Sequence, residues 1–202
     1  MFKKFAADAL GISDIGVIVG PADYNKVDAD DYLFSEDDEQ IFFLIKSKKD
    51  EYCFTNLALI HVDGDSAVSS KRSIKRYEYS SFQISGVAIE TAGTLDMDIE
   101  LKFRMDDIAF SIDVKKTFIE QLKDIYKALI SIGRQQRRDE VCRKNALRAL
   151  EATASVHKLN IAPDGGSLTT QFNALLAALN TAVLDTHTKR DFSDVFTKYI
   201  HN

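Results

Sequence analysis

The sequence has little of several features that would each mark a particular class of protein. It contains two cysteines, Cys53 and Cys142, which lie far apart and form no CxxC pair, so a disulfide scaffold is disfavoured and a reducing cytoplasm is expected. No apolar run approaches the length of about 18 residues that a membrane-spanning helix requires. Asp8 interrupts the segment that would have to be apolar in a signal peptide. These absences predict a cytoplasmic protein.

Basic residues are not in excess either. The 26 lysines and arginines are outnumbered by 31 aspartates and glutamates, which gives a formal net charge of -5. A protein with this balance has no global positive field, so we expect no specific nucleic-acid partner and no non-specific coating of nucleic acid.

The motifs of common enzyme active sites are missing as well. The sequence has no G-x-S-x-G elbow, no glycine-rich phosphate loop ending in Lys-Ser or Lys-Thr, and no histidine pair at metal-binding spacing. His61 and Cys53 fall in predicted strands, where a structural histidine and a small buried thiol explain them. We therefore expect no catalytic residue, cofactor or metal site, and hence no enzyme.

An acidic stretch from Asp28 to Glu39 holds seven acidic residues and no basic one. Asp28, Asp30 and Glu39 occupy the first, third and twelfth positions of an EF-hand loop, but Tyr32 stands where an oxygen ligand is needed and Leu33 where glycine makes the turn. Calcium binding of this type is therefore excluded. We expect a solvated loop.

Seven strands are predicted from alternating apolar and polar residues separated by turn residues. They cover residues 41–47, 51–55, 57–62, 71–79, 82–91, 95–103 and 108–114. A helix follows at residues 117–132, where apolar side chains step by three and four. Because no helical pattern separates the strands, the spacing indicates an antiparallel barrel or sandwich rather than a parallel sheet.

The remainder of the chain is predicted to be helical. Residues 2–10 form a short amphipathic helix, and a basic helix runs from Arg134 to His157. Two further apolar stripes follow, at residues 168–183 and 192–200. These faces either fold into a small bundle or meet copies of themselves in an assembly.

Two segments resemble the signature of bacterial pleckstrin-homology (PH) domains. They are the run Glu90-Thr91-Ala92-Gly93-Thr94-Leu95-Asp96, continued by Asp98 and Glu100-Leu101-Lys102, and the Thr55-Asn56 corner between two apolar strands. The resemblance implies an α+β fold with a mainly β core: a seven-stranded PH-like barrel of two antiparallel sheets capped by a helix, plus an all-α C-terminal extension. It further implies that the extension is an oligomerisation region.

These patterns divide the chain into three parts. Residues 1–29 form an N-terminal helix and connector, residues 30–133 the PH-like barrel with its capping helix, and residues 134–202 the helical extension. We expect a non-catalytic binding or scaffolding module that self-associates into a homo-oligomer, with a further protein partner left open. The expected oligomer interface consists of apolar residues of the extension, namely Leu147, Leu150, Phe172, Leu175, Leu176 and Leu179.

An alternative function is that of a peripheral membrane adaptor. Lys46, Lys48 and Lys49 surround the first hairpin and are the candidate contacts to an anionic lipid. No arginine accompanies them to clamp a phosphate with two hydrogen bonds, so specific phosphoinositide binding is not expected and any membrane contact should be weak.

Overall fold

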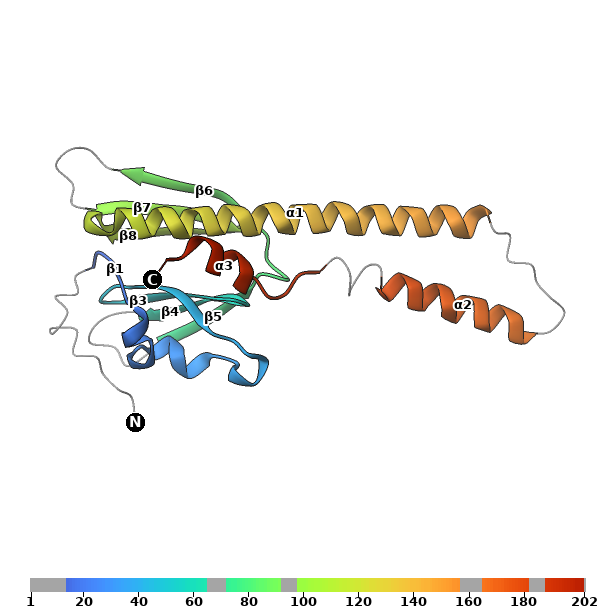
Figure 1. Cartoon of the computed structure of the whole chain (residues 1–202), viewed down its shortest axis with the longest axis horizontal. Helices are drawn as coiled ribbons and strands as arrows, with labels where there is room; N and C mark the ends of the chain where they lie inside the picture. The colour runs from blue at the N-terminus through green and yellow to red at the C-terminus, as the bar shows by residue number, and fades with distance from the viewer. Residues whose placement is uncertain (1–13, 65–71, 92–97, 157–164, 182–187, 202) are drawn as a thin grey trace. The chain divides into compact units, whose positions relative to one another are not determined.

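The fold is described by a computed structural model (Figure 1). It describes residues 14–64, 72–91, 98–156, 165–181 and 188–201. The helix expected at residues 2–10 lies outside these ranges. The chain divides into two compact units, which we call the barrel unit (Met1–Gly133 and Arg190–Asn202) and the extension unit (Arg134–Lys189). The last residues thus belong with the barrel, although the sequence placed them in the extension.

The first sheet is antiparallel and has the strand order β1-β2-β3-β4-β5. Its strands are β1 (Val17–Ile18), β2 (Ile41–Lys46), β3 (Asp50–Thr55), β4 (Ala58–Gly64) and β5 (Arg72–Glu78). β2 to β5 are the first four predicted strands. β1 lies in the segment expected to be only a connector, so that expectation was incomplete.

The second sheet is also antiparallel and contains the three remaining predicted strands in the order β6-β7-β8. They are β6 (Ile84–Thr91), β7 (Asp98–Met105) and β8 (Ile108–Lys115). Along β7 the buried residues alternate with half-buried and exposed ones, as the period-2 pattern of the sequence requires. The predicted PH-like architecture is therefore confirmed.

The segment before β1 joins the two sheets. The Gly16 N–H donates to the Asp113 carbonyl at 2.7 Å, and the Lys115 N–H donates to the Gly16 carbonyl at 2.9 Å. A side chain at Gly16 would not fit, because its Cβ would lie 2.8 Å from Ile45 Cγ2 and 2.9 Å from the Asp113 oxygen. Glycine is therefore required where β1 crosses from one sheet to the other.

The capping helix is the first part of α1 (Ile119–Val156). Its apolar stripe is fully buried in the barrel core, as Leu122, Ile125 and Leu129 show. The helix comes so close to β6 that a Cβ on Gly133 would lie 2.4 Å from the Ile84 carbonyl oxygen. α1 then continues without a break into the extension unit, which also contains α2 (Gly165–Asn180).

Three short 3-10 segments cover the outer face of the first sheet. They are η2 (Pro21–Lys26), η3 (Asp28–Tyr32) and η4 (Ser35–Asp37), while a fourth, η5 (Lys116–Phe118), leads into α1. Val27 and Ala29 pack there with buried residues of the strands, such as Ile60. The expectation of a solvated acidic loop is therefore wrong in part, because Ala29 of this stretch is buried in a second core and Leu33 packs against it.

The C-terminal helix α3 (Ser193–Tyr199) lies beside the barrel (Figure 1). Phe192 and Phe196 are fully buried in the main core, together with most of Val195 and Ile200. This packing explains why the last residues belong to the barrel unit.

Candidate functional site

The Thr55-Asn56 corner organises three segments of the chain. The Asn56 side-chain oxygen accepts from the Gln40 N–H at 2.9 Å, and its amide donates to the Asp191 carboxylate at 3.1 Å. Thr55 Oγ1 accepts from the Ala58 N–H at 2.9 Å and lies 2.6 Å from a carboxylate oxygen of Glu39. Asn56 is therefore a structural residue, because its hydrogen bonds are used within the fold.

The same corner receives the C-terminal helix. The Phe192 N–H donates to the Asn56 carbonyl at 2.9 Å, and the Asp191 carboxylate accepts from the Ser193 N–H at 2.7 Å just before α3. Phe196 stacks on Phe42 with 5.3 Å between ring centroids. The docking on Asn56 links residues 135 positions apart and had no local signal in the sequence.

A buried ion pair lies next to this corner. The Arg76 guanidinium donates from Nη1 to both oxygens of Glu39 at 3.0 Å. Glu39 also accepts from the Phe34 N–H at 2.8 Å, and the Arg76 guanidinium lies 4.4 Å from the centre of the Phe34 ring. Because Glu39 is paired and hydrogen-bonded within the fold, it is not offered as a reactive carboxylate.

An apolar groove opens beside this pair on the outside of the first sheet. Its volume is about 310 Å³, and it is lined by Asp31, Tyr32, Leu33, Phe34, Ile60, Ile74 and Arg76. Tyr32, Phe34 and Ile74 remain 40%, 48% and 38% exposed. Clustered exposed apolar side chains are unusual on a surface that contacts only water, so this groove is a candidate interaction surface.

The three lysines of the first hairpin do not form one exposed cluster. The Lys46 ammonium pairs with Glu51, which also accepts from the Ala29 N–H at 3.0 Å, so Glu51 holds η3 onto the sheet and Lys46 is committed to Glu51. Lys48 and Lys49 stand exposed at the turn. Of the three candidate lipid contacts, two are available, and the role of this surface stays a prediction.

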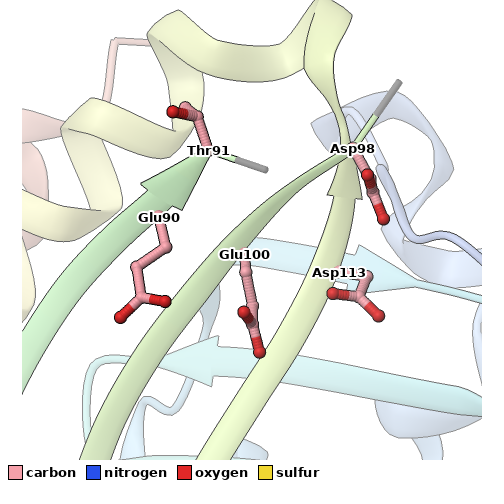
Figure 2. A pocket seen from close by; sticks show the side chains of 5 residues that line it. All are labelled: Glu90, Thr91, Asp98, Glu100 and Asp113. Atoms are coloured by element: carbon pink, nitrogen blue, oxygen red, sulfur yellow. The ribbon is translucent and has the colours of Figure 1, made fainter. Parts of the chain in front are cut away.

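A second, acidic pocket of about 140 Å³ lies on the other sheet and is lined by Glu90, Thr91, Asp98, Glu100 and Asp113 (Figure 2). The Lys102 ammonium lies 2.7 Å from Glu90 and 2.8 Å from Glu100. Its hydrogen bond to Glu100 lowers the pKa of that carboxylate, while desolvation raises the pKa of Asp113. The pocket is thus neutralised in part by a lysine of its own sheet. Among the residues that the structure describes, no group of three or more His, Cys, Asp or Glu side chains is placed so that it could hold a metal ion.

Three strand residues that could carry chemistry have defined surroundings within the fold. Burial raises the pKa of the Cys53 thiol, so the reactive thiolate is disfavoured. Burial and the nearby Asp50 carboxylate likewise raise the pKa of Tyr52. The His61 ring stacks on Tyr52 at 4.4 Å and lies 3.1 Å from Asp50. This is the structural environment expected for His61.

The extension unit carries two kinds of exposed side chain. On α2, Phe172, Leu175 and Leu176 are 60%, 37% and 41% exposed, whereas Leu179 on the same stripe is half-buried. On α1, Leu147 is exposed and Leu150 is half-buried. The described part of the chain contains no helix long and apolar enough to cross a membrane.

A second face of α1 in the extension unit is basic. Arg134, Arg137, Arg138 and Arg148 are exposed there, together with Val141, which is 54% exposed. These residues follow one another at steps of three, one, three and seven, which places them within roughly a third of the helix circumference. We call this set the basic stripe.

Comparisons with known proteins agree with this architecture. Residues 9–132 match the family model of the bacterial PH domain, and residues 150–202 match that of the YvbH-like oligomerisation region. The sequence is 50% identical over 205 residues to the uncharacterised protein YvbH of Bacillus subtilis, covering both chains completely. It is also similar to the crystal structure of a PH-domain-containing protein from Exiguobacterium sibiricum, with 39% identity, a TM-score of 0.85, and coverage of 93% of this chain and 100% of the other.

Proposed function

Because the chain belongs to the bacterial PH-domain family and carries a YvbH-like oligomerisation region, we propose that it is a non-catalytic binding and scaffolding module that self-associates through its extension. The interface would consist of Leu147 and Leu150 on α1 and of the α2 stripe Phe172, Leu175, Leu176 and Leu179. The unpaired, buried Cys53 supports a cytoplasmic location.

The observation that carries this proposal is the exposure of the α2 stripe. Phe172, Leu175 and Leu176 lie three and four residues apart on one face, and each leaves more than a third of its surface open to water. Removing such surface from water contributes about 25 cal/mol per Å² to association, from which docking and side-chain ordering subtract a large share. A second copy of the same stripe provides an apolar surface of matching character.

The test is light scattering on the purified full chain. We expect an oligomer, and we expect Leu176→Asp to shift it toward a smaller species without unfolding the barrel, since a carboxylate would be placed in the apolar interface.

The matched control is Ala174→Asp, which introduces the same charge into α2. Residue 174 is also exposed, but it stands roughly 200° around the helix from Leu176, so this substitution should leave assembly unchanged. A monomeric full chain, or equal effects of the two substitutions, would refute the proposal.

A further inference from the structure

Two surfaces that lie in different units carry complementary chemistry. The first is the apolar groove on the barrel unit, and the second is the basic stripe on α1 in the extension unit. We propose that the groove of one copy receives the basic stripe of a second copy. This inference rests on the proposed self-association and names the pair of surfaces that would carry it.

One side of the groove is formed by an acidic segment of the chain. Asp31 lines it, and Asp30, Glu36 and Asp37 come from the same short acidic stretch. Within the described residues, none of these four carboxylates forms an ion pair. The one cation of the lining, Arg76, is already paired with Glu39. We call these four acidic residues the rim. In the described part of the chain they are carboxylates without an ion-pair partner, and Asp31 stands beside the apolar lining of the groove.

The basic stripe carries the opposite charge, and its arginines likewise lie beside an exposed apolar side chain. Val141 is an exposed apolar residue with Arg137 and Arg138 before it and Arg148 after it. Where ion pairs are recorded in this part of α1, they involve Arg143 and Lys144, which both bind Glu140. The arginines of the stripe form none within the described residues.

The side chains of the two surfaces can form apolar, hydrogen-bonding and stacking contacts with one another. Val141 can enter the apolar groove, while flanking guanidinium groups reach the rim carboxylates with paired hydrogen bonds. The exposed rings of Tyr32 and Phe34 can also stack with guanidinium groups, as Arg76 already does on Phe34. A lysine-rich surface would offer neither the paired hydrogen bonds nor the same stacking.

Each copy contributes a different surface to this contact. Used reciprocally by two copies it belongs to an isologous dimer, and used once from each copy to the next it is heterologous and belongs to a ring. The contact would add an electrostatic component to the apolar α2 interface. It would therefore affect the orientation in which two copies bind and the rate at which they associate.

The experiment uses two full-length charge-reversal variants. The stripe variant carries Arg137→Glu and Arg138→Glu, and the rim variant carries Asp30→Lys and Asp31→Lys. Each variant alone places like charges on both surfaces, so each should raise the apparent Kd of self-association by about tenfold or more in analytical ultracentrifugation. An equimolar mixture of the two should recover association, since every contact between unlike copies then joins opposite charges.

The control is a variant with the same change in charge elsewhere on α1, Lys123→Glu with Lys127→Glu. Both lysines are exposed on the capping part of the helix, and this variant should associate like the unsubstituted chain. For the unsubstituted chain itself, raising NaCl from about 0.05 M to about 0.5 M should weaken association, because salt screens exposed charges.

The outcomes separate this inference from the proposed function. Recovery in the mixture supports the groove–stripe contact and shows that both variants fold. If Leu176→Asp dissociates the protein while the charge reversals and salt do not affect it, the inference is wrong and the proposed function stands. A monomeric unsubstituted chain overturns both. A mixture that fails to recover association, when both variants are folded by circular dichroism, overturns the inference alone.

Discussion

The docking of α3 on the barrel makes a strong prediction about stability. Phe196 is fully buried, stacks on Phe42 and lies 6.1 Å from the ring of Tyr79. Replacing a buried phenylalanine with alanine typically costs about 3–5 kcal/mol, since the ring's transfer free energy is lost and a cavity remains. Single domains are stable by only about 5–15 kcal/mol, so Phe196→Ala should remove a large share of the barrel's stability.

The matched control is Phe172→Ala in α2, because it makes the same chemical change at a side chain that is 60% exposed. This substitution should reduce the free energy of unfolding by less than about 0.5 kcal/mol in dilute protein, where self-association adds least to stability. Urea unfolding followed by tyrosine fluorescence measures both. Equal losses would mean that α3 is not part of the barrel fold. By the same reasoning, a chain truncated after Gly133 should be strongly destabilised, because Phe192 and Phe196 would be missing from the core.

Three further predictions concern the barrel unit. Leu122→Ala should reduce the free energy of unfolding by roughly 2–5 kcal/mol in a denaturant melt, because Leu122 is fully buried, whereas Lys123→Ala should change it little. Similar losses from the two substitutions would mean that another face of α1 packs against the barrel. Gly133→Ala should crowd the backbone of β6, reduce the free energy of unfolding by about 1–3 kcal/mol and so lower the Tm. An unchanged Tm would show that α1 does not approach β6 so closely. Binding to anionic vesicles through Lys48 and Lys49 should be weak and should disappear with added salt; saturable, salt-resistant binding to one head group in a sedimentation assay would contradict this.

Much of the barrel could be predicted from the sequence because its elements carry their own periodicity. Strands β7 and β8 alternate buried and more exposed residues, β2 to β4 are short apolar runs bounded by turn residues, and the capping helix repeats apolar residues at three and four. β1 could not be found in this way, since Val17 and Ile18 are too few to show a period. Its position is fixed by pairing with β2 and by the close approach of Gly16 to β8.

The acidic stretch shows where local sequence misleads. Its seven carboxylates suggested a solvated loop, but Ala29 is buried against the sheet and Glu39 is neutralised by an arginine 37 residues away. A long-range partner of this kind leaves no local pattern. For the same reason the groove between Tyr32 and Ile74 was not foreseen, as its two sides come from separate segments.

The position of the C-terminal helix bears on assembly as well as on stability. The extension unit is attached to the barrel at both ends, through Gly133 in α1 and through Phe192 at the Asn56 corner. A segment fixed at two points has less conformational freedom to lose on association than one fixed at a single point. Phe196→Ala, although outside the proposed interface, should therefore also weaken self-association at protein concentrations and temperatures where the barrel remains folded. Ultracentrifugation beside a folding control checks this, and an unchanged association constant for a variant with detached α3 would show that the second attachment has no part in assembly.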